Sequence, residues 1–104
     1  MLLKLPKNIV ILSNNFKITY NKNSNGGYFS WKDNILEIGT KDLNDNPIYV
    51  YSVISHEIME VILVGLGGRF ENNRTMNNYL FNFDHQTFEN AMQLHSECMI
   101  KFIK

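Results

Sequence analysis

The chain has 104 residues, of which 44% are hydrophobic and 19% are charged, a composition typical of a folded domain rather than a disordered chain. Ten basic and ten acidic residues give a formal net charge of zero, so electrostatics provides no argument for nucleic acid as a partner. The length suits one domain with one core, which we expect to span residues 1–104.

The single cysteine, Cys98, excludes an intrachain disulfide and is typical of a reducing compartment. Near the N-terminus, Pro6 and Lys7 interrupt the apolar residues and no small-residue cleavage site follows, which argues against a signal peptide. The longest apolar run is shorter than the roughly 20 residues that a membrane span needs. We therefore expect a cytoplasmic protein that makes no use of a membrane.

The first 40 residues predict three or four strands. Segments rich in β-branched and aromatic residues alternate with loop residues, and in "FKITY" the apolar side chains recur at every second position. The connections are short, which favours antiparallel pairing because a parallel crossover needs about a dozen residues. The expected strands are 8–12, 16–20, 28–31 and 35–40, with a hairpin turn at 32–34.

Two helices are expected to follow. Asn46 is a suitable N-cap and Pro47 suits the first helical position, so the first helix should run from there to about Val64. The glycines of "GLGG" (65–68) would end it. Residues 69–83 have no clear pattern. The second helix should run from His85 to about Ile103, with an apolar stripe along it: Phe88, Ala91, Met92, His95 and Met99.

The first helix contains the segment "SHEIMEVIL", in which His56, Glu57 and Glu60 lie among apolar residues. A helix turns by about 100° per residue, so His56 and Glu60 lie about 40° apart, one turn from each other, and can converge on one ion. The zinc-protease pattern His-Glu-x-x-His uses the same spacing, with its glutamate facing a metal-bound water. Glu60 replaces the second histidine of that pattern, but zinc also accepts carboxylate oxygen, and two histidines with one glutamate form a catalytic ligand set.

A third ligand would have to come from elsewhere in the chain, and the histidines available are His85 and His95. A histidine on an apolar stripe is more often a core residue, so we prefer His85 to His95. Glu89, four residues after His85, is an alternative ligand or a solvated residue. Asp84 would either orient His85 as a neighbouring carboxylate or cap the second helix.

The order of short strands, "SHEIMEVIL" and the downstream "FDHQTFENAMQL" resembles the minimal zincin-like proteins encoded by phages and prophages. The resemblance covers roughly residues 28–95. It implies an α+β, zincin-like fold in which a small antiparallel sheet packs on the motif helix and a C-terminal helix. It also implies that His56, Glu60 and His85 are the metal ligands and that Glu57 is the general base.

These features predict a metal-dependent, peptidase-like hydrolase that acts on a peptide or protein. Zinc is the expected metal, although carboxylate-rich sites also suit manganese or iron. The strand at 35–40 would edge the cleft and pair with an extended peptide. One alternative is a zincin-fold protein that binds metal without catalysis and acts as a protein-interaction module. Another is a structural module with no metal.

Overall fold

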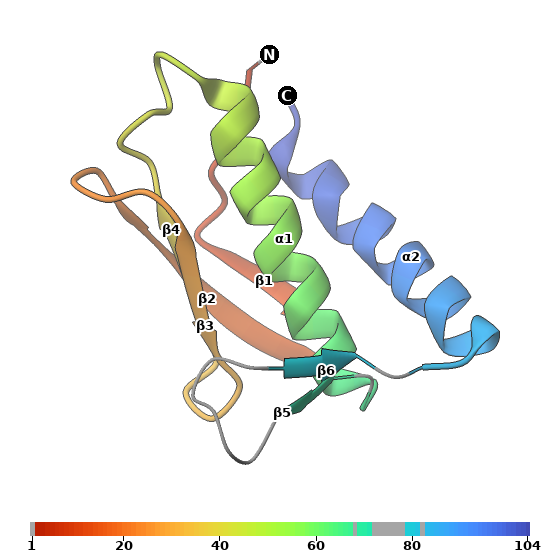
Figure 1. Cartoon of the computed structure of the whole chain (residues 1–104). Coiled ribbons are helices and arrows are strands. Elements are labelled where there is room, and N and C mark those ends of the chain that lie inside the picture. Colours follow the sequence, from red (N-terminus) through yellow and green to blue (C-terminus); the bar gives the residue numbers. More distant parts are fainter. Residues whose placement is uncertain (1, 68, 72–78, 82) are drawn as a thin grey trace.

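The computed structural model describes residues 2–67, 69–71, 79–81 and 83–104, which form an α+β fold, as predicted (Figure 1). Four strands make a mixed sheet in the order β1-β2-β4-β3, and two helices lie on one side of it. A separate pair of short strands occupies part of the segment without a clear sequence pattern. The elements are β1 (Asn8–Ile11), β2 (Asn14–Asn21), β3 (Gly27–Ser30), β4 (Ile35–Gly39), α1 (Pro47–Gly65), β5 (Arg69–Glu71), β6 (Tyr79–Phe81), α2 (His85–Met99) and the 3-10 helix η1 (Ile100–Phe102).

The sheet is not wholly antiparallel, which corrects the expectation from the short connections. β1 pairs antiparallel with β2, and β3 with β4, but β2 and β4 run parallel, from Lys17 opposite Ile35 to Asn21 opposite Gly39. The parallel pairing is possible because β3 forms part of the crossover, which brings the connection to about the dozen residues required. β4 is therefore an interior strand, and β3 takes the edge position predicted for residues 35–40.

The two tight turns of the sheet differ in how they could be recognised from the sequence. Leu12 and Ser13 join β1 to β2, and both have positive φ angles, of 49° and 67°. A two-residue hairpin prefers this left-handed conformation, but asparagine or glycine usually adopts it, so Leu12 and Ser13 do not indicate a turn. Asn34, with φ 54°, closes the turn between β3 and β4, where the sequence predicted a hairpin.

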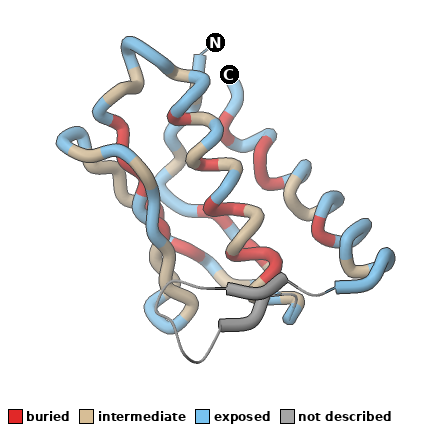
Figure 2. The backbone as a smooth tube through the Cα atoms, in the orientation of Figure 1, coloured by how far each residue is buried: buried red, intermediate tan, exposed pale blue. Residues whose placement is uncertain are grey.

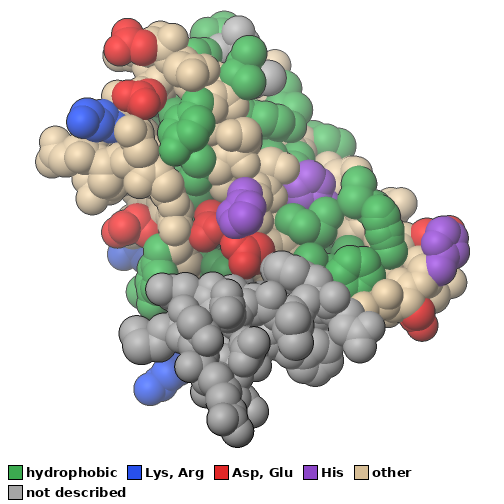
Figure 3. Space-filling model, viewed as in Figure 1, with side chains coloured by type: hydrophobic (Ala, Val, Ile, Leu, Met, Phe, Trp, Pro, Cys, Tyr) green, Lys and Arg blue, Asp and Glu red, His purple; other side chains and the backbone are tan. Residues whose placement is uncertain are grey.

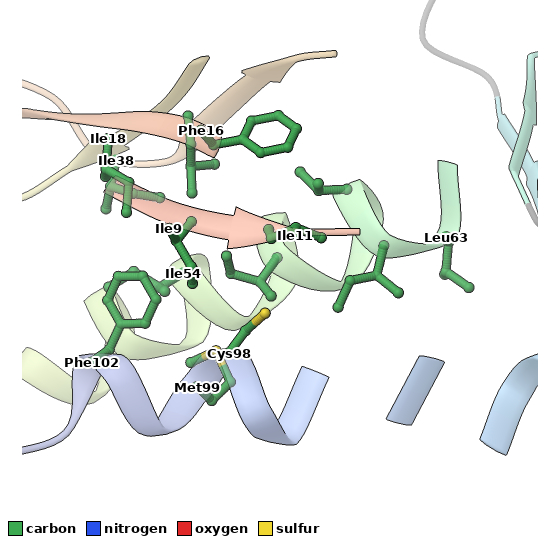
Figure 4. Close-up of a cluster of buried hydrophobic side chains, with 14 of the residues drawn as sticks. Ile9, Ile11, Phe16, Ile18, Ile38, Ile54, Leu63, Cys98, Met99 and Phe102 are labelled. Atoms are coloured by element: carbon green, nitrogen blue, oxygen red, sulfur yellow. The ribbon is translucent and has the colours of Figure 1, made fainter. Parts of the chain in front are cut away.

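The core lies between the sheet and the helices, and Figure 2 shows buried positions recurring along both helices and the sheet. Alternation along β1 buries Ile9 and Ile11 and exposes Val10. α1 contributes the largest group of fully buried side chains, and the end of α2 adds Cys98 and Met99 (Figure 4). The fully buried side chains among the described residues are Ile11, Phe16, Leu36, Ile38, Val50, Ile54, Ile58, Val61, Ile62 and Phe102.

Aromatic side chains tie the sheet to α1 and to the N-terminal segment. Trp31 packs edge-on against Phe16, with ring centroids 5.0 Å apart, and its Nε1 donates to the carbonyl oxygen of Val61 at 3.1 Å. The hydroxyl of Tyr20 donates to the carbonyl oxygen of Pro6 at 2.5 Å. Burial raises the pKa of Tyr20, because the ionised phenolate would lose its hydration.

Both helices begin where the sequence predicts. The Asn46 side chain accepts from the backbone N–H of Tyr49 at 3.2 Å, and the helix ends at Gly65, one residue beyond the expected limit. α2 begins at His85 and ends as an α-helix at Met99, and η1 continues the helical segment to Phe102, one residue short of the expected limit. Ile103 instead forms an isolated bridge with Leu3.

The apolar stripe predicted for α2 is only partly buried. Ala91 and Met99 belong to the core and His95 is half-buried, but Phe88 and Met92 are exposed. The N-terminal half of α2 thus contributes less to the core than its apolar side chains indicate.

By length and composition α1 is apolar enough to cross a membrane, a test that the core helix of a water-soluble protein also passes. The charged residues of α1 divide its apolar residues into short runs, so the helix contains no long uninterrupted apolar run. Seven of its residues are buried within the fold.

The buried face of β1 gives a test of the core. Replacing Ile11 with alanine should lower the free energy of unfolding by about 2–5 kcal/mol, because it removes packed methyl groups and leaves a cavity. Val10, its neighbour in the same strand, is 63% exposed, so Val10→Ala should change the stability by no more than about 0.5 kcal/mol. Urea unfolding of both variants would measure this, and equal effects would contradict the assigned inward face.

Candidate metal site

The middle of α1 brings His56, Glu57 and Glu60 together. Their potential ligand atoms all lie within 4.8 Å of one another. Among the described residues, these three side chains are the group of histidine and acidic residues close enough to bind one metal ion together. Nε2 of His56 lies 2.6 Å from Oε2 of Glu60, as expected for residues one helical turn apart. Figure 3 shows histidine and carboxylate side chains together on this face of the molecule.

The three side chains differ in their access to solvent. The side chain of His56 is 69% exposed and that of Glu60 is 17% exposed. Glu57 is only 6% exposed and is the one buried charged residue within segments 2–67 and 83–104. A cation would therefore reach His56 and Glu60 from outside, with the carboxylate of Glu57 beneath them.

A hollow of about 600 Å³ opens between α1 and the edge strand β3. Glu57 and Val53 line it from the helix, together with His56 and Glu60, and Gly27 lines it from the strand. Among the described residues β3 pairs with β4 alone, which makes it an edge strand of the sheet. The candidate ligands thus lie beside a strand edge at which an extended chain could be bound.

A second hollow, of about 520 Å³, lies between α1 and α2. His56 and Glu60 line this one as well, so the pair separates the two hollows. Its other lining residues are largely apolar: Met59, Leu63 and Phe83, with Ser55 and His95. A hydrogen bond of 2.9 Å joins Oγ of Ser55 to Nε2 of His95 and links the two helices at this point.

The structure does not bring His85 to the cluster. Its side chain is 87% exposed at the start of α2, and its Nε2 lies 2.7 Å from Oε1 of Glu89. His95 follows ten residues later, about 15 Å along the helix, at the point where α2 faces the cluster on α1. The sequence could not reveal this difference, because it depends on where the two helices lie against each other.

Asp84 takes the capping role that was one of its two predicted roles. Its Oδ1 accepts a hydrogen bond from the backbone N–H of Thr87 at 2.8 Å. The hydrogen bonds from Thr87 lower the pKa of Asp84, because they stabilise the ionised carboxylate. The side chain of Asp84 is fully exposed and stabilises the helix end.

The donor set of the cluster suits a divalent cation. One imidazole nitrogen and two carboxylates are ligands that zinc accepts, and manganese and iron accept them as well. Ligand atoms about 2.1 Å from a tetrahedral ion lie roughly 3.4 Å apart, somewhat further than His56 and Glu60 do here. Side-chain rotations that move these two atoms apart by less than roughly 1 Å would bring them to the separation of two metal ligands.

Comparison of the chain with protein-family models, with curated proteins and with solved structures found no match. The similarity to zincin-like proteins therefore stays a prediction from the motif residues. The evidence for function is the geometry and chemistry of His56, Glu57 and Glu60.

The cap at Asp84 gives a pH-dependent test. A carboxyl whose pKa is lowered on folding stabilises the native state above its unfolded pKa of about 3.9, and this contribution is lost as the pH falls through the lowered value. Asp84→Asn keeps an acceptor but has no charge. We expect the wild type to be more stable than this variant at pH 7, and the difference to disappear as the pH falls below about 4 and passes through the lowered pKa of Asp84. Thermal unfolding across this range measures it, and a difference independent of pH would contradict the charged cap.

Proposed function

We propose that the protein is a metal-dependent hydrolase of peptidase type, with Glu57 as general base. The observation that carries this proposal is the meeting of His56, Glu57 and Glu60 within 4.8 Å at a surface hollow beside the edge strand β3. A buried carboxylate next to two potential ligands is unusual for a helix that otherwise packs as core, because burying a charge is costly. Buried ionisable groups that lie close to other ionisable groups are concentrated at functional sites.

In this proposal His56 and Glu60 hold the ion, and His95 is the third ligand. His95 is preferred to His85 because it lines the same hollow as His56 and Glu60. Ligand histidines are commonly oriented by a hydrogen bond to the second ring nitrogen. The contact between Ser55 and Nε2 of His95 would serve this purpose and leave Nδ1 as the ligand atom.

When bound, a divalent cation lowers the pKa of a coordinated water and polarises a carbonyl group. Glu57 would accept the proton from the attacking water and later give it to the leaving group. The edge of β3 would bind the substrate in extended form through backbone hydrogen bonds, which fits a peptide. Burial of Glu57 would keep bulk water away from the proton transfer.

A second candidate function follows from the same distances. Glu57 is close enough to His56 and Glu60 to be a ligand itself. The protein would then bind a metal with no group left as base and would act as a binding module. The role of Glu57 therefore separates the two candidates.

Metal binding and hydrolysis can be measured separately on purified protein. We expect one zinc ion per chain, lost in His56→Ala and Glu60→Ala, and a lower melting temperature after chelation, because an ion bound to the native state stabilises it. Glu57→Gln should keep the zinc but lower the hydrolysis of a quenched-fluorescent peptide library at least about 10²-fold. Metal content by emission spectroscopy and initial rates of hydrolysis give the two readouts.

Loss of zinc in Glu57→Gln would identify Glu57 as a ligand and favour the binding module. A chain that takes up no zinc, manganese or iron, and whose melting temperature ignores chelators, would contradict both candidates.

The choice of third ligand can be tested by two matched substitutions in α2. His95→Ala should weaken zinc binding strongly, because it removes the proposed third ligand, which lines the same hollow as His56 and Glu60. His85→Ala should leave the zinc affinity unchanged, because this side chain is exposed and pairs with Glu89. Competition with a zinc-binding dye measures both affinities. The reverse order would restore His85 as the ligand and contradict the assignment of His95.

A further inference from the structure

Gly27 lies directly against the side chain of Glu57. A Cβ atom at position 27 would lie 2.5 Å from Cγ and 3.1 Å from Cδ of Glu57, and 3.3 Å from the carbonyl oxygen of Glu37. Carbon atoms in contact normally stay about 3.5–4.0 Å apart. The side chain of Glu57 thus occupies the space that a side chain would fill at any residue other than glycine.

The backbone around Gly27 cannot easily move away. Gly27 is paired with Ile38 in the antiparallel ladder of β3 and β4. The preceding carbonyl, that of Gly26, accepts a hydrogen bond from the N–H of Gly39 at 2.7 Å. On the opposite side, Ile54 and Ile58 are fully buried and hold α1 in place. A methyl group at position 27 would therefore be accommodated mainly by displacing the flexible side chain of Glu57.

We propose that Gly27 is a positioning residue for Glu57, which is an inference that rests on the proposed role of Glu57 as general base. The bare backbone of β3 sets how far the carboxylate lies from the strand and keeps it under His56 and Glu60. A shift of about 1 Å in a reacting group can cost about 10²-fold in rate. The two atoms nearest to a Cβ at position 27 both belong to Glu57, so its substitution should act first on the proposed base.

The first test compares two glycine-to-alanine variants. Gly27→Ala should lower kcat by about 10- to 100-fold, with KM for the peptide and the zinc affinity changed less than about threefold. Gly67, just after α1, is the control. A Cβ there meets nothing within 4 Å, but its φ of +75° makes alanine strained, so Gly67→Ala should lower the melting temperature and keep kcat. An equal loss of kcat in both variants would show a general effect of stability and overturn the inference.

A double-mutant cycle tests whether Gly27 acts through Glu57. In the Glu57→Gln background, the residual activity should not fall further when Gly27→Ala is added, because the base is already absent. A further tenfold fall would mean that Gly27 acts by another route, which would overturn the inference.

Stability gives a readout that does not need activity. Glu57→Ala removes the Cγ and Cδ atoms that the new methyl group would meet. If Gly27→Ala folds poorly, adding Glu57→Ala should restore folding, and a double variant that stays unfolded would overturn the inference. Failure of the wild type to hydrolyse any peptide would overturn the proposed function together with this inference. Hydrolysis by the wild type with full kcat in Gly27→Ala would overturn this inference alone.

Discussion

The packing of α1 against the sheet is the constraint on which the rest of the structure depends. Its fully buried side chains meet those of β2 and β4, so both the position and the rotation of the helix are set by the core. The narrow sector of the helix surface that the core does not cover contains Ser52, His56 and Glu60. Glu57 lies at the border of this sector, next to β3. The direction in which the candidate ligands face is thus set by core packing, whereas their spacing is that of one helical turn.

The order of the strands decides what lies beside this sector. Had the sheet been a simple meander, β4 would have formed the edge near the helix. With β4 inside, β3 takes that place and presents a short strand that begins with glycine. A glycine inside a strand weakens the strand but allows another group to approach its backbone closely. Here that group is the carboxylate side chain of Glu57.

Local patterns in the sequence predicted most of the elements but not their arrangement. Asn46 and Asp84 marked both helix starts because capping is decided within three residues. The convergence of His56 with Glu60 also follows from helical geometry alone. The parallel pairing of β2 with β4, and the location of His95 rather than His85 beside the cluster, depend on contacts between distant segments. No periodicity in a single chain encodes these contacts, and the same holds for the change from α-helix to 3-10 helix after Met99.

The two hairpins have a consequence for how the sheet is assembled. β1–β2 and β3–β4 are each closed by a tight turn, and such local pairings form at little cost in chain entropy. The parallel contact between β2 and β4 is the seam that joins the two hairpins. At this seam the second hairpin pairs through β4 and not through β3. Ile18 and Leu36, opposite each other across the seam, are both covered by the core. The sheet is therefore built from two local hairpin units, and the strand pairing between distant parts of the chain is concentrated at the parallel seam, where the core also covers it.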